Sequence, residues 1–321
     1  MNHAHSGICP DDLASVQNGG IRTKNMRQIT LEELLEAGCH FGHQVTRSNP
    51  KAREFIFEAR DNIHIIDLAI THEWLMEAAN FVLELAKKPG STMIVVGTKR
   101  QAQPVVLAEV KRGNEEIKRE EEKGSLMHIT NRWIGGLLTN FTEVSKNLKK
   151  LHDIEVLLKG DGKTIYTKKE LGLFDKDRQK LESLYGGIKN IKRVPDALFI
   201  IDSRMEELAV REASRTGVST VAIVDTNADP ALVDYPIPAN DDAVGSVELL
   251  TKFITDAWVE GKNNIKIEVP VEEKPKKVSL KSSEAQEKSE KEVKAKTPKA
   301  GKKEKPVKEK VTKKIKAKKG E

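Results

Sequence analysis

The 321-residue sequence is poor in the features that mark membrane, secreted or redox proteins. It has two cysteines, Cys9 and Cys39, whose spacing fits neither a metal site nor a CxxC motif. Such a low number of cysteines fits a protein of a reducing compartment, and we predict that Cys39 is a small core residue. No apolar run approaches the ~20 residues that span a bilayer, and residues 1–25 lack the apolar segment of a secretory signal. These absences predict a cytoplasmic protein that binds no membrane.

Familiar catalytic motifs are missing as well. The phosphate-binding spacings GxxxxGK[ST] and GxGxxG do not occur in the sequence. No Ser-His-Asp, Cys-His or paired-carboxylate order has a convincing spacing. The sequence motifs therefore indicate no catalytic site and no cofactor.

The net charge of +6 is unevenly distributed. Residues 269–321 contain 19 lysines, no arginine and nine acidic residues, a net of +10, which leaves residues 1–268 at −4. A slightly acidic body cannot coat RNA non-specifically, so any RNA contact must be a localised patch. The Lys-rich tail, residues 265–321, is predicted to be disordered because it cannot bury enough apolar surface to offset chain entropy. Residues 1–25 are predicted to be a disordered leader or a mis-assigned start before Met26.

Short, nearly continuous apolar runs recur through the predicted body, residues 26–264. They are Ile63–Ile66, Thr92–Val96, Leu126–Thr130, Ala197–Ile201 and Ser219–Val224. Continuous apolarity is typical of parallel strands that are covered on both faces. Helical patterns, such as Thr71–Lys87 and Arg204–Thr216, alternate with them, and Ala243–Glu260 closes the series. Thr30 and Glu33 predict a capping box for the first helix. The alternation predicts a doubly wound α/β sheet.

Two helical segments within residues 139–192 interrupt this alternation. The first, Thr139–Lys159, and the second, Lys169–Lys192, each have apolar residues at helical spacing and are joined by a turn at Gly160–Gly162. The narrow apolar seam predicts an antiparallel coiled-coil hairpin, with two ordinary surface helices as the alternative. The intensely charged segment Lys111–Lys123 is predicted to lie in a solvent-facing helix or loop.

The segment NRWIGGLLTN, residues 131–140, combines features that suit RNA. Arg132 could clamp a phosphate, and Trp133 could offer a stacking plane. The Gly135–Gly136 pair lets the backbone approach a partner closely. Asn131 and Asn140 add polar side chains at the two ends. Core packing of Trp133 is the alternative interpretation.

Two more basic segments are candidates for phosphate contact. In VGTKR, Gly97 ends a predicted strand, and Lys99 and Arg100 precede the next helix, where free N–H groups favour anions. An early loop around Asn49–Pro50 adds four cations. These are Arg47, Lys51, Arg53 and Arg60. For both segments the alternative is a set of solvated charges.

Histidine and aspartate residues form a possible metal-binding set. His40 and His43 could share one helix face, and five aspartates lie near strand ends. These are Asp202, Asp225, Asp229, Asp241 and Asp242. Without a third placed ligand the pattern is weak, so we interpret the histidines as hydrogen-bonded structural residues and predict no metal.

Five segments together carry a specific resemblance. They are AGCHFGHQ at 37–44, VGTKR at 96–100, NRWIGGLLTN at 131–140, PDALFIID at 195–202 and AIVDTNADP at 222–230. In this order, from Met26 to about Asn264, the chain resembles the family of bacterial small-subunit ribosomal protein number two.

The resemblance implies a flavodoxin-like α/β body with the hairpin inserted. It also implies a structural role in the small ribosomal subunit during translation, with no enzyme activity. The resemblance further implies that the charged segment Lys111–Lys123 is a local insertion. The expected partners are small-subunit (16S) rRNA and neighbouring small-subunit proteins, including the mRNA-binding protein number one. Two alternatives remain open: a nucleotide- or sugar-phosphate-binding enzyme, and a metal hydrolase that uses His40, His43 and the aspartates.

Overall fold

A five-stranded parallel sheet forms the centre of the molecule in the computed structural model, which describes residues 27–159 and 166–265. Its strands are β4 (Met93–Val96), β5 (Leu126–Ile129), β6 (Ala197–Ile201), β7 (Ser219–Val224) and β8 (Tyr235–Pro238). They lie in the order β5-β4-β6-β7-β8, and every neighbouring pair is parallel. Counted from β4, this is the 2-1-3-4-5 order of flavodoxin-like folds. The predicted doubly wound sheet is confirmed.

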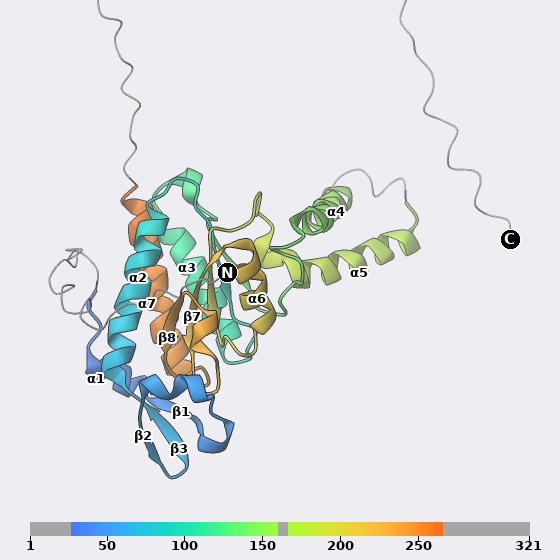
Figure 1. Cartoon of the computed structure of the whole chain (residues 1–321). Helices are drawn as coiled ribbons and strands as arrows, with labels where there is room; N and C mark the ends of the chain where they lie inside the picture. The colour runs from blue at the N-terminus through green and yellow to red at the C-terminus, as the bar shows by residue number, and fades with distance from the viewer. Residues whose placement is uncertain (1–26, 160–165, 266–321) are drawn as a thin grey trace, which may run out of the picture. The chain divides into compact units, whose positions relative to one another are not determined.

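Side chains alternate between two buried faces of this sheet. Met93 and Val95 join the core beneath α2 (Leu68–Ala86), α3 (Ala102–Glu116) and α7 (Val244–Asn263). Ile94 and Val96 join a second core with the buried face of α6 (Glu207–Thr216) and residues around Trp133. Figure 1 shows these helices flanking the sheet. Because both faces are covered, the strands are apolar at most positions, with His128 in β5 and Ser219 and Thr220 in β7 as exceptions.

A separate small sheet lies before α2, with α1 (Leu31–Glu36) preceding it. Its strands are β1 (Phe41–Gln44), β2 (Ile56–Arg60) and β3 (Ile63–Ile66), in the antiparallel order β1-β3-β2. The expectation that Ile63–Ile66 joins the parallel sheet is therefore wrong. Asp61 and Asn62 both have positive φ, and this tight turn folds β3 back onto β2. The capping box of Thr30 and Glu33 is confirmed.

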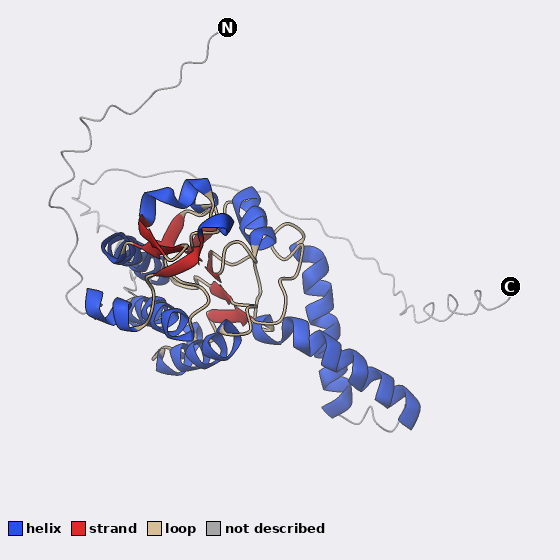
Figure 2. Ribbon diagram, turned by 90° about the horizontal axis from the view of Figure 1, so that it is seen from below, coloured by secondary structure: helices blue, strands red, loops and turns tan. Residues whose placement is uncertain are grey.

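The interrupting segment forms two helices, α4 (Phe141–Lys159) and α5 (Lys168–Tyr185), which pack against each other. Figures 1 and 2 show this pair extending from the sheet region. Val144 and Leu151 of α4 are buried in the second core, which anchors the base of the pair. The two helices of the predicted hairpin are present and in contact. The turn at Gly160–Gly162 lies outside the described residues, and the coiled-coil packing stays a prediction.

The second helix of the hairpin ends at Tyr185 rather than at Lys192. Just after the helix, Gly187 lies so close to the body that a Cβ there would be 2.1 Å from the carbonyl oxygen of His128. After this close approach, Ile188 and Ile191 are buried in the second core of the body. The predicted second helix, Lys169–Lys192, therefore extends too far, because its last apolar residues, Ile188 and Ile191, belong to the body.

The charged segment Lys111–Lys123 is only partly solvent-facing. It extends α3 to Glu116, but Ile117 is fully buried and Glu122 nearly so. The Glu122 carboxylate lies 2.6 Å from Nζ of Lys262, a lysine with no exposed surface. Burial lowers the pKa of Lys262 despite this partner. The segment thus fastens the end of α7 to the body, which the sequence did not indicate.

Candidate nucleic-acid interface

The carboxyl ends of the parallel strands meet at one edge of the sheet, where most of the predicted site residues lie. Lys99 and Arg100 follow β4, and Asn131 and Arg132 follow β5, its direct neighbour. Asp202 follows β6. Asp225 follows β7, and Asp241 and Asp242 lie shortly after β8. Parallel pairing therefore assembles cations and carboxylates from distant segments on one edge.

Lys99 lies at the centre of this edge, among three carboxylates. Its Nζ is 2.7 Å from Asp242 Oδ1, 2.8 Å from Asp241 Oδ1 and 3.3 Å from Asp202 Oδ2. The lysine side chain is 15% exposed and that of Asp241 is 1% exposed. Lys99 was expected to meet an RNA phosphate, and in this structure its charge is matched by carboxylates of the protein itself. Burial works against the charged form, yet the surrounding aspartates raise the pKa of Lys99 above its usual value.

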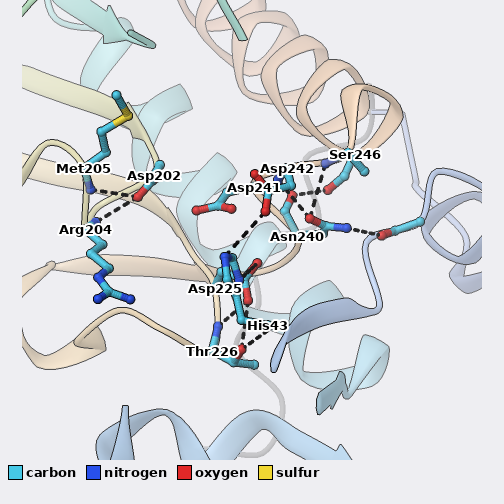
Figure 3. Close-up of polar contacts among 12 residues, drawn as sticks. His43, Asp202, Arg204, Met205, Asp225, Thr226, Asn240, Asp241, Asp242 and Ser246 are labelled. Atoms are coloured by element: carbon cyan, nitrogen blue, oxygen red, sulfur yellow. Dashed lines mark hydrogen bonds and ion pairs between the residues drawn. The ribbon is translucent and has the colours of Figure 1, made fainter. Parts of the chain in front are cut away.

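The carboxylates of the cluster differ in environment. Burial, together with the charges of Asp202 and Asp225, raises the pKa of Asp241 to about 7. Asp202 has a positive φ of 70° and its Oδ1 accepts from the backbone N–H groups of Arg204 and Met205, as Figure 3 shows. An aspartate tolerates this left-handed conformation better than most residues, and the turn directs its other oxygen toward Lys99.

His43 bridges two of the aspartates (Figure 3). Its Nδ1 lies 3.0 Å from Asp225 Oδ2, and its Nε2 lies 3.5 Å from Asp242 Oδ2. Its backbone N–H donates to Thr226 Oγ1 at 2.9 Å. The hydrogen bond with Asp225 raises the pKa of His43. These contacts tie β1 to the end of β7.

His40 and His43 do not share a helix face, because the residues from Phe41 to Gln44 form the strand β1. His40 packs on Phe41 with ring centroids 4.0 Å apart, and burial lowers its pKa. His43, Asp241 and Asp242 each offer a ligand atom, and these atoms lie within 4.8 Å of one another. This trio could hold a metal ion, although Lys99 already supplies positive charge to the two aspartates.

The early basic loop packs beside the end of β7. The backbone N–H of Asn49 donates to the carbonyl of Thr226 at 2.8 Å. Lys51 Nζ donates to Asp229 Oδ2 at 2.6 Å, so Asp229 serves this loop and not the Lys99 cluster. Arg47 and Arg53 are exposed nearby in sequence, whereas Arg60 is exposed at the end of β2, next to the turn of the small hairpin.

The NRWIGGLLTN loop separates into an exposed and a buried part. Arg132 is exposed, as is Asn140, which lies directly before α4. Asn131 is exposed and its Nδ2 donates to the carbonyl of Ser183 at 2.5 Å. Trp133 is only 5% exposed and belongs to the second core. A buried ring cannot stack on a base, so core packing is the correct interpretation of Trp133.

Comparison with known proteins places the chain in a family. The model for ribosomal protein S2 matches residues 34–261, which is more than half of the chain. The small ribosomal subunit protein uS2 of Geotalea uraniireducens (strain Rf4) is 44% identical over 249 residues, covering 77% of this chain and 93% of the relative. The protein of the same name from Coprothermobacter proteolyticus is 44% identical over 237 residues, covering 74% and 84%.

The chain belongs to the ribosomal protein S2 family. As a member of the S2 family it is a structural, non-enzymatic constituent of the small subunit of the cytoplasmic ribosome. Its partners there are rRNA and other small-subunit proteins. The two enzyme alternatives are not favoured. Flavodoxin-like enzymes bind ligands at the switch point, here between β4 and β6, where this chain places the Lys99–Asp202 ion pair. In the described part of the chain, no helix is long and apolar enough to cross a membrane.

Proposed function

We propose that the protein contacts small-subunit rRNA with the exposed cations at the carboxyl edge of its parallel sheet. The proposal rests on the adjacency of β4 and β5, which brings exposed Arg100 and exposed Arg132 to neighbouring strand ends. Guanidinium groups are suited to phosphate because they can donate two parallel hydrogen bonds. The further members of this contact set are Arg47, Lys51, Arg53, Asn131 and Asn140, with Arg60 at its margin.

Lys99 and Trp133 are outside this proposed contact set but support it. The slightly acidic body would repel RNA if the carboxylates of the edge were left uncompensated. Lys99 reduces their negative charge, since it contacts three of them within 3.3 Å. Trp133 fixes the loop that carries Arg132 by burying its ring in the core. In this proposal Lys99 lowers the negative charge of the edge and Trp133 fixes the position of the loop, and neither residue contacts phosphate.

A different surface suits a protein neighbour. The small sheet exposes Phe57 at 69%, Phe41 at 51% and Ile63 at 39%. Large exposed apolar side chains mark protein–protein contacts, whereas phosphate contact calls for cations. We infer that a neighbouring small-subunit protein docks on this sheet, and the mRNA-binding protein number one is the candidate. Loss of that protein alone from subunits that carry Phe57→Ser would support the assignment, and its undiminished presence would contradict it.

The RNA proposal is tested by competition between full-length wild-type and variant chains for small subunits that lack this protein. Arg100→Glu and Arg132→Glu should each lower incorporation about tenfold or more, because repulsion replaces attraction at a close contact. The matched control is Arg215→Glu, since Arg215 is exposed and precedes β7 at the opposite edge of the sheet. Thermal melts check folding. Equal incorporation of well-folded Arg100 and Arg132 variants would remove this edge from the interface.

A further inference from the structure

Glu212 is a carboxylate on the buried side of a helix. The other buried residues of α6 are Ala209, Val210 and Ala213, so the inward face is otherwise apolar. Glu212 is 5% exposed. A buried carboxylate is costly unless its oxygens are hydrogen-bonded, so its partners show what holds it there.

Among the described residues, all hydrogen-bond donors to the Glu212 carboxylate come from the NRWIGGLLTN loop. Oε1 accepts from the backbone N–H of Gly136 at 2.8 Å and from Trp133 Nε1 at 3.4 Å. Oε2 accepts from the N–H of Leu138 at 3.3 Å and from the N–H and hydroxyl of Thr139 at 3.4 and 3.3 Å. One side chain thus organises the loop from Trp133 to Thr139.

The backbone N–H groups around Glu212 resemble an anion-binding site in which the bound anion is the Glu212 carboxylate. Backbone N–H groups that converge on one point form a concave nest of the kind that binds phosphate. Gly136 contributes a positive φ of 87°, which glycine adopts without strain. Because the Glu212 carboxylate fills this nest, the N–H groups of Gly136, Leu138 and Thr139 are not available to RNA. The exposed side chain of Arg132 remains available for contact.

We propose that Glu212 is a positioning residue for RNA contact: its carboxylate fixes the loop from Trp133 to Thr139 and so presents Arg132 outward at the end of β5. This rests on the RNA contact proposed above for Arg132. The residue does not touch RNA itself. Its effect passes through the loop, and therefore it should depend on the presence of the arginine.

Glu212→Gln is the direct test, because the amide has nearly the same shape but turns an NH₂ group toward donors that need an acceptor. The full-length variant should incorporate into small subunits about tenfold less well than wild type, as Arg132→Ala does. Its binding to subunits that lack the protein should also lose about one unit of salt slope, the signature of a lost phosphate contact. The control is Glu207→Gln on the same helix, where Glu207 is half exposed and pairs with Arg211.

A double-mutant cycle separates positioning from plain stability. Once Glu212 is glutamine, Arg132→Ala should cost little more, because the arginine is already misplaced. Additive losses, with the salt slope unchanged by Glu212→Gln, would overturn the positioning role and leave the RNA proposal standing. A neutral Arg132→Ala in the wild-type background would overturn the positioning role and remove Arg132 from the proposed RNA contacts, whereas the Arg100 contact would be judged by its own variant.

Hydrogen exchange gives a second readout. The amides of Gly136, Leu138 and Thr139 should exchange faster in Glu212→Gln while the amides of β4 stay protected, and unchanged exchange would refute the proposal. If this variant does not fold, Thr139→Val removes a single hydroxyl donor to Glu212 and should show the same changes at about two- to threefold. An unchanged salt slope and exchange pattern in Thr139→Val would then overturn the role of Glu212.

Discussion

Replacing Lys99 by methionine should destabilise the protein in a pH-dependent way. The change removes the ammonium that lies within 3.3 Å of Asp202, Asp241 and Asp242, and two of these carboxylates are at most 10% exposed. Removing one partner of a buried ion pair costs about 3–5 kcal/mol. Because Lys99 itself is 15% exposed, we expect about 3 kcal/mol at a pH near 8.

The pH dependence follows from Asp241, whose pKa is raised to about 7 from an ordinary value near 3.8. Between these values the folded state binds more protons than the unfolded state, so stability due to this group falls as pH rises. Without Lys99 the pKa of Asp241 should rise further. The loss of stability with rising pH then continues to a higher pH and becomes larger. At a pH of about 5.5 Asp241 is largely protonated in both proteins, and the loss should shrink to about 1 kcal/mol.

Urea unfolding of the full-length chains at the two pH values measures this difference. Arg100→Met is the matched control, because Arg100 is the adjacent residue and is exposed. It should change the free energy of unfolding by less than about 0.5 kcal/mol at either pH. An equal loss for Lys99→Met at both pH values would show that its ion pairs with the aspartates do not carry the effect.

Three further outcomes are expected. Lys262→Met should lower the free energy of unfolding in urea by about 3 kcal/mol, because it leaves the Glu122 carboxylate without its partner. Adding Glu122→Gln should recover most of this loss, and no recovery would contradict the ion-pair explanation. Leu151→Ala should lower the free energy of unfolding by about 2–5 kcal/mol, because Leu151 is 2% exposed. Leu184→Ala should lower it clearly less, because Leu184 is 39% exposed, and the reverse order would be inconsistent with this packing. Removal of residues 269–321 should leave the melting temperature and incorporation at moderate salt unchanged, since their lysines add only a salt-sensitive attraction; a truncated chain that fails to fold would refute this.

Local sequence patterns were sufficient for much of the fold. Four of the five apolar runs form parallel strands, because a strand that is buried on both faces needs apolar side chains at most of its positions. Thr30 and Glu33 formed the predicted capping box, a motif that depends on four consecutive residues alone. The strand β8 (Tyr235–Pro238) was not predicted, because its two prolines are atypical of a strand. The structure places β8 at the edge of the sheet, where proline is tolerated.

The sequence by itself determined the identity of the family, the parallel sheet and the segments that carry candidate contacts. Each of these depends on short runs of neighbouring residues. Only the tertiary structure decided how the side chains are used. Lys99 meets Asp241 across 142 positions, and Glu212 meets Gly136 across 76. Nothing local distinguishes a lysine that faces solvent from one enclosed by carboxylates. That difference is set by which strand ends the parallel sheet places side by side, since charges interact through space and not along the chain.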